Sequence, residues 1–138
     1  MVEMELNKII IDEKRQEQII VLKEKAGERM LPIVIGFVEA TSIKMSLAGH
    51  LPPRPMTHDL LHSVIQAFGA GLKKVMIDKL EAGTFHAKLV LAPSSGEGAE
   101  TVVDARPSDS IALAVRFKAP VFVAEEVLGK ADMFHPGV

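Results

Sequence analysis

Cysteine is absent from the 138 residues of this chain, and so are tryptophan and tyrosine. Without cysteine there can be no disulfide, no thiolate nucleophile and no cysteine-ligated zinc, which fits a reducing compartment. Aromatic residues make up only 4% of the sequence, so the core must be built from aliphatic side chains, methionine and a few phenylalanines. Few aromatic side chains also leave little surface on which single-stranded nucleic acid could stack its bases.

Neither sign of charge dominates, and no apolar run is long enough to cross a membrane. Sixteen Lys and Arg against eighteen Asp and Glu give a net charge of −2, so no overall positive field attracts nucleic acid. The first residues carry acidic side chains at positions 3 and 5 and lack the apolar core of a signal peptide. We therefore expect a soluble cytoplasmic protein with no membrane partner.

Alternating apolar residues predict most of the strands. Residues 2–11 and 18–24 have the pattern of an antiparallel hairpin, and 73–92 have that of a second hairpin, broken at 82–83. Residues 101–105 add a third strand to the second hairpin. The continuous apolar run 31–36 predicts a buried strand, and 121–124 a short one.

Three main helices and a short terminal one are expected between these strands, over 39–49, 57–68, 108–117 and 125–132. Thr57 and Ser108 are the expected N-caps of the second and third helices. One apolar stripe marks the second helix: Leu60, Leu61, Val64, Ile65 and Phe68. The sequence thus predicts an α+β fold with mixed, mostly antiparallel sheets, in one compact domain over 1–132 with a frayed tail at 133–138.

A proline-stiffened stretch, PPRPMTHDLL at 52–61, leads into the second helix and carries Arg54, Thr57, His58 and Asp59. Thr57 and Asp59 have a sufficient structural explanation, because a cap and a first-turn acid together stabilise a helix by about 1–2 kcal/mol. The spacing of HDLLH resembles a zinc-protease helix. However, the base should be Glu and no clear third-ligand motif follows, so the pattern argues against that chemistry.

A second polar turn, DARPSDS at 104–110, contains Asp104, Arg106, Ser108 and Asp109. One interpretation is an Asp–Arg ion pair that fixes the turn from strand to helix. The other is a site in which Asp104 and Asp109 bind Mg²⁺ or Mn²⁺ and Arg106 holds a phosphate. Glu39, at the start of a helix after a buried strand, is a third candidate position.

These blocks carry a resemblance to a known family. LPIVIGFVEA (31–40), RPMTHDLL (54–61), GTFHAKL (83–89) and DARPSDSIALAVR (104–116) resemble the bifunctional nuclease domain family in order and spacing. The resemblance covers roughly residues 5–130. It implies nuclease activity on DNA and RNA in a compact domain that forms homo-oligomers.

Our mechanistic hypothesis is metal-assisted phosphodiester hydrolysis. The expected catalytic residues are Glu39, His58, Asp59, Asp104 and Asp109. Glu39, Asp104 and Asp109 would bind Mg²⁺ or Mn²⁺, and His58 would move a proton. The expected substrate-binding residues are Arg54, Thr57, Arg106 and Ser108. The alternative is a non-catalytic regulatory or assembly module in which the same side chains form a structural salt-bridge network.

Overall fold

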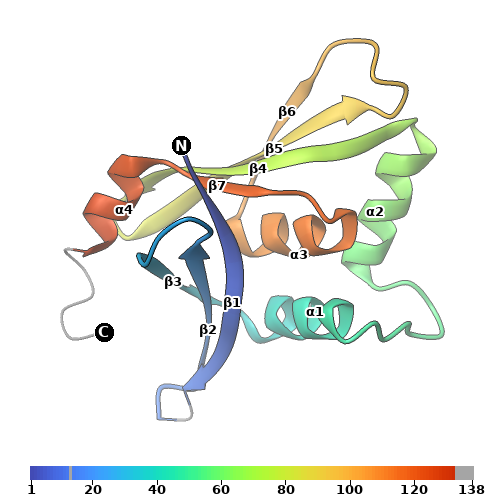
Figure 1. Cartoon of the computed structure of the whole chain (residues 1–138). Helices are drawn as coiled ribbons and strands as arrows, with labels where there is room; N and C mark the ends of the chain where they lie inside the picture. The colour runs from blue at the N-terminus through green and yellow to red at the C-terminus, as the bar shows by residue number, and fades with distance from the viewer. Residues whose placement is uncertain (13, 133–138) are drawn as a thin grey trace.

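A computed structural model describes residues 1–12 and 14–132 of the chain (Figure 1). Seven strands and four helices follow one another in these residues: β1 (Val2–Asp12), β2 (Glu17–Glu24), β3 (Met30–Ile35), α1 (Phe37–Leu47), α2 (Thr57–Ala67), β4 (Ala70–Glu81), β5 (Thr84–Pro93), β6 (Thr101–Ala105), α3 (Pro107–Phe117), β7 (Val121–Val123) and α4 (Glu125–Asp132). The predicted elements are all present, and the α+β class is confirmed. The predicted tail at 133–138 lies outside the described residues.

The strands form one sheet in the order β3-β2-β1-β7-β4-β5-β6. Both predicted hairpins are confirmed, β1 with β2 and β4 with β5, and β6 pairs antiparallel with β5. The turn of the second hairpin has positive φ at Ala82 and Gly83, which suits the twist of a two-residue hairpin loop. The short strand β7 lies between β1 and β4 and is parallel only to β4, so it joins the two hairpins into one sheet.

The core lies between the sheet and the helices α1 and α3. Figure 1 shows α3 beside β4 and β5, with α1 next to it. α3 is buried because its first three turns are almost wholly small or apolar, and Ile111, Ala112 and Leu113 are nearly inaccessible. The aliphatic core expected from the composition is confirmed, since the buried cluster consists of Ile, Val, Leu, Ala and Met side chains.

Three local predictions were wrong. β3 is an edge strand and not a fully buried one, which explains how it accommodates Pro32 and leaves Val34 exposed. Thr57 and Ser108 are not N-caps: the helices begin one and two positions further back, with Met56 and Arg106 in the extended cap position.

The apolar stripe of α2 does not face the core. Four of its five members, Leu60, Leu61, Val64 and Phe68, are exposed, and the only buried residue of this helix is His58. The helix packs instead through its more polar side against α3 and β4. Among the described residues, no helix is long and apolar enough to cross a membrane.

Candidate functional site

The site is built where the first turns of α1, α2 and α3 meet. The third residue of each helix is acidic: Glu39 in α1, Asp59 in α2 and Asp109 in α3. A carboxylate in the first turn is stabilised by the helix dipole and by the unpaired backbone N–H groups there. Asp59 shows this directly, because its Oδ2 accepts the N–H of Met56 at 3.0 Å.

Arg106, the cap residue of α3, connects two of these carboxylates. Its Nε donates to Asp109 Oδ2 at 2.9 Å, and its Nη2 lies 2.9 Å from Glu39 Oε1. The hydrogen bond and charge of Asp109, followed by those of Glu39, raise the pKa of Arg106. Gly36 leaves room for Glu39, since a Cβ on Gly36 would come within 2.6 Å of Glu39 Oε2. The Arg106 side chain is 65% exposed, so its guanidinium can meet a ligand.

His58 connects Asp109 to the interior of the helix layer. Its Nε2 is 2.8 Å from Asp109 Oδ1 and its Nδ1 is 2.7 Å from the hydroxyl of Ser42 in α1. A neutral ring fits both contacts: Nε2–H donates to Asp109, and Nδ1 accepts from Ser42. His58 is only 6% exposed, so both ring nitrogens are engaged inside the protein. The predicted direct proton transfer by His58 is therefore not supported by this geometry, which makes the ring a positioning group for Asp109.

Burial of the Asp109 carboxyl pushes its pKa up, but the hydrogen bonds from Arg106 and His58, together with the charge of Arg106, outweigh burial. The net result is a lowered pKa. Asp109 is thus an ionised carboxylate at neutral pH, held from two sides and partly open to solvent.

Arg116 closes the network on its buried side. Its Nε donates to Asp59 Oδ1 at 2.9 Å, its Nη1 to the carbonyl of Ala112 at 2.9 Å and its Nη2 to the Ser42 hydroxyl at 3.0 Å. Its side chain is only 7% exposed. Burial raises the pKa of Asp59, but the Met56 N–H and then Arg116 outweigh it and lower the pKa overall. Helices α1, α2 and α3 are therefore tied together by charged hydrogen bonds.

Four predicted residues lie outside this network: Asp104, Arg54, Thr57 and Ser108. Asp104 is on β6 with its side chain 77% exposed, and it pairs with Lys88 of the neighbouring strand at 3.1 Å. The predicted ion pair between Asp104 and Arg106 is therefore wrong, because Arg106 binds Glu39 and Asp109. Arg54 and Thr57 are exposed, and neither side chain has a hydrogen bond or ion pair with another residue that the structure describes.

The predicted metal ligands do not fit a bound cation. Within residues 1–12 and 14–132, no three His, Cys, Asp or Glu side chains form a group that could hold a metal ion. Glu39 and Asp109 are separated by the guanidinium of Arg106, and Asp104 is committed to Lys88. Three carboxylates around one Mg²⁺ or Mn²⁺ would require a rearrangement of Arg106, so no step through a metal follows from this geometry.

A cavity of about 280 Å³ adjoins Arg106. It lies between the end of β3, the β4–β5 turn and the start of α3, and Ser108 lines it together with Thr84 and Phe85. Ser108 is buried as a residue, but among the described residues only Asp78 Oδ1, and not the Ser108 hydroxyl, is a buried side-chain atom without a hydrogen-bond partner. This small cavity places one guanidinium and two hydroxyls beside an apolar wall.

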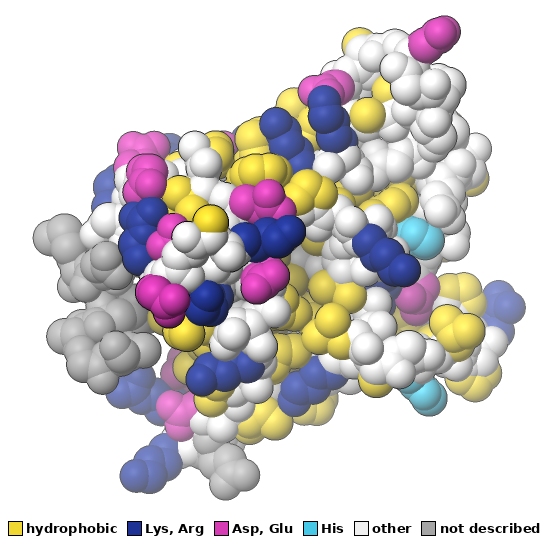
Figure 2. Space-filling model, in the orientation of Figure 1, with side chains coloured by type: hydrophobic (Ala, Val, Ile, Leu, Met, Phe, Trp, Pro, Cys, Tyr) yellow, Lys and Arg dark blue, Asp and Glu magenta, His cyan; other side chains and the backbone are white. Residues whose placement is uncertain are grey.

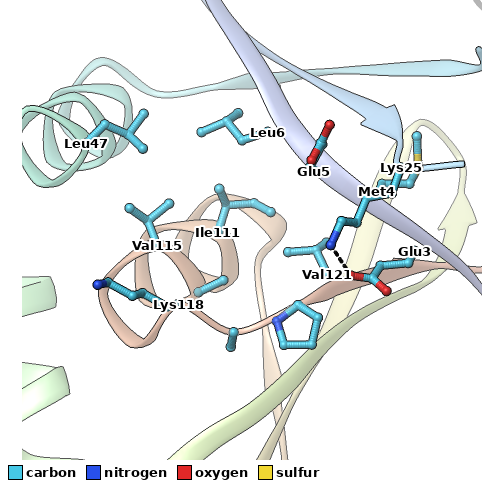
Figure 3. A pocket seen from close by; sticks show the side chains of 13 residues that line it. Glu3, Met4, Glu5, Leu6, Lys25, Leu47, Ile111, Val115, Lys118 and Val121 are labelled. Atoms are coloured by element: carbon cyan, nitrogen blue, oxygen red, sulfur yellow. Dashed lines mark ion pairs between the residues drawn. The ribbon is translucent and has the colours of Figure 1, made fainter.

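A larger cavity, of about 520 Å³, lies elsewhere. Figure 3 shows it between β1 and the ends of α1 and α3, with Glu3 and Lys25 paired across 3.2 Å at its edge. None of the predicted site residues lines it. Figure 2 shows that acidic and basic side chains alternate over the left half of the face in view, so no basic surface there marks a nucleic-acid site.

Sequence reasoning missed Ser42 and Arg116. Arg116 carried a usable signal, since a charged residue in a helix that is otherwise small and apolar must have a partner when the helix is buried. Ser42 had none, because a single serine in a helix is usually solvated or bonded to its own backbone.

Comparison with known proteins gives a consistent result. A sequence model described as "Bifunctional nuclease domain" matches residues 20–136. An uncharacterized protein of Mycobacterium tuberculosis is 41% identical over 128 residues, which is 93% of this chain and 74% of that protein. Bifunctional nuclease 1 of Oryza sativa subsp. japonica is 27% identical over 78% of this chain, and Bifunctional nuclease 2 is 29% identical over 82%. The chain spans about a third of the length of these two plant proteins.

Proposed function

Because the chain belongs to the bifunctional nuclease domain family, we propose that it hydrolyses phosphodiester bonds in DNA and RNA at the first turns of α1 and α3. The observation that carries this proposal is Arg106, an exposed guanidinium held by two carboxylates beside a cavity. A cytoplasmic location and self-association of the chain belong to the same proposal.

The roles follow from which atoms can reach a substrate. Arg106 Nη1 takes no part in the bonds to Glu39 and Asp109, so it can donate to a phosphate oxygen. Asp109 and Glu39 are the carboxylates that could orient an attacking water. His58 fixes the position of Asp109 from behind.

The net charge of this cluster shows that binding a phosphodiester requires a further positive charge. Glu39 and Asp109 outweigh Arg106 by one negative charge, and that excess repels a phosphodiester. A divalent cation, or the exposed Arg54, would offset it. The dependence on Mg²⁺ or Mn²⁺ therefore stays a prediction, and it requires Arg106 to release at least one of its two carboxylates.

The test is cleavage of labelled single-stranded and double-stranded DNA and RNA by the purified chain, in EDTA, in Mg²⁺ and in Mn²⁺. We expect Arg106→Met and Asp109→Asn to lower the cleavage rate at least 100-fold, the scale of losing one charged transition-state contact. Glu126→Gln, an exposed carboxylate of α4 outside the network, is the matched control and should cleave normally.

Asp104→Asn separates the two arrangements of the site. A normal rate in this variant supports a centre at Arg106, whereas a 100-fold loss would restore Asp104 to the catalytic set. Wild-type protein that cleaves none of the four substrates in any of the three buffers would refute the proposal.

One observation favours an architectural alternative. Arg116 is buried and its hydrogen bonds are all to other groups of the protein, and each acidic residue of the network lies in the first turn of its helix. In a regulatory or assembly module the network would only hold three helices together. Variants that lose stability while the wild type shows no cleavage would favour this second function.

A further inference from the structure

Helix α2 exposes its apolar side to solvent, which is the reverse of the usual arrangement for an amphipathic surface helix. Between 40% and 88% of each side chain is exposed in a set that we call the α2 surface: Leu51, Leu60, Leu61, Val64 and Phe68. Leu51 comes from the segment before α2, and the other four come from α2 and its C-cap. Figure 1 shows α2 at the margin of the molecule, beside α3.

The chemistry of this surface restricts its partner. Residues 60–72 contain no Asp, Glu, Lys or Arg. A nucleic acid needs Lys or Arg against its phosphates, and a helix that lies on a membrane usually has them on its polar face. The α2 helix has neither type between 57 and 67. A neutral apolar surface, in contrast, meets a copy of itself without repulsion, as a two-fold axis requires.

The area is adequate for such a contact. From the full areas of Leu, Val and Phe side chains, the α2 surface offers roughly 500 Å² of apolar area per copy. A stable interface buries about 800 Å² per partner, part of it in a polar rim. His50, Arg54 and Gln66 are exposed residues from the same two segments and can provide such a rim.

We propose that two copies of this chain associate through the α2 surface about a two-fold axis. Within one chain α2 is held by the buried His58, by the Asp59–Arg116 ion pair, by a tilted contact of His62 with Phe117 at 4.3 Å between ring centroids, and by the partly buried Ile65. A second copy covers the opposite side of the helix. Association therefore also holds His58 against Asp109. Any effect of association on cleavage rests on the proposed nuclease function, whereas the association itself does not.

The test is the mass of the full chain in solution, measured by sedimentation velocity from 1 to 100 µM without substrate. We expect wild type at twice its 15.0 kDa. The double variant Leu60→Glu/Phe68→Glu should be a monomer, with its dissociation constant raised at least 100-fold. Both side chains are exposed, so its circular dichroism should match wild type. Val102→Glu, at an equally exposed valine on β6, is the control and should stay dimeric.

A monomeric wild type at 100 µM, or a double variant that stays dimeric, would overturn the proposal. A dimer that cleaves no substrate would leave this interface supported while contradicting the proposed nuclease function. Hydrogen exchange gives an independent measurement: amides of residues 60–67 should exchange at least tenfold faster in the monomeric variant. Equal exchange rates would contradict the link between association and the position of α2.

Discussion

The two arginines of the network predict opposite outcomes for the same substitution. Arg106 and Arg116 each bind a first-turn carboxylate at 2.9 Å, but the Arg106 side chain is 65% exposed and that of Arg116 is 7% exposed. Replacement by methionine keeps most of the aliphatic volume and removes the charge. The difference between the two variants therefore reports the effect of burial.

The magnitudes follow from what each change leaves behind. Arg106→Met leaves Glu39 and Asp109 close to water, so we expect a loss of no more than about 1 kcal/mol, as for exposed ion pairs. Arg116→Met removes the guanidinium that binds Asp59 and a donor to the buried Ser42 hydroxyl. Breaking a buried pair costs about 3–5 kcal/mol, and the partial exposure of Asp59 places the expected loss near 3 kcal/mol.

Urea unfolding at pH 7, followed by circular dichroism, measures both losses, and thermal unfolding should place Arg116→Met about 10 °C below wild type. A double-mutant cycle with Asp59→Asn should return a coupling energy of at least about 1 kcal/mol, because the two side chains are in direct contact. A loss below about 0.5 kcal/mol for Arg116→Met would refute the view that this buried pair holds α2 to the other helices.

Three further predictions concern pH and backbone positions. The pKa values of Asp59 and Asp109 are lowered in the fold, so their stabilisation is complete above the unfolded value near 4 and decreases as the pH falls below it. Urea midpoints of an Asp59→Asn/Asp109→Asn variant should therefore change less than wild type between about pH 4.5 and 2.5. Gly36→Ala should displace the flexible Glu39 carboxylate from Arg106 at a cost below about 1 kcal/mol, visible as a shift of the Arg106 Nε–H signal in NMR. Lys118→Gly should raise the urea midpoint, by about 0.5 kcal/mol of stability, because Lys118 ends α3 at a φ of 55°.

The strands and most helices could be predicted because each has a local pattern that its surroundings reinforce. Alternation gave both hairpins, and Gly83, which tolerates positive φ, marked the turn of the second one. The orientation of α2 could not be predicted, since an apolar stripe indicates only that something covers it. Within one chain the covering partner is assumed to be the core, and α2 departs from that assumption with Phe68 and Leu60 in solvent.

The residues of the candidate site that lie at helix starts could be predicted from the sequence. The hydrogen bonds and ion pairs that join them could not. His58 and Asp109, both named as expected catalytic residues, do lie together, because the starts of α2 and α3 approach each other in space. Asp104 failed because it lies directly opposite Lys88 in the paired strand and binds it, whereas the chain has left the strand at Arg106, which caps α3. The role of Ser42, which joins His58 to Arg116, depends on how α1 packs against α2 and α3, so the sequence alone could not predict it.

The network has a buried end, which can only position other groups, and a solvent-exposed end, which can contact a substrate. At the inner end, Arg116 and Ser42 are sealed in the protein, so they can position other groups but cannot touch a substrate. At the outer end, Arg106 lies open beside a cavity and shares Asp109 with His58. Asp109 is therefore both part of the buried network that positions the helices and part of the exposed group that can contact a substrate. A substitution at Asp109 should affect both stability and cleavage, whereas Arg106 should affect cleavage with little loss of stability, and that separation is what a purely architectural network would not produce.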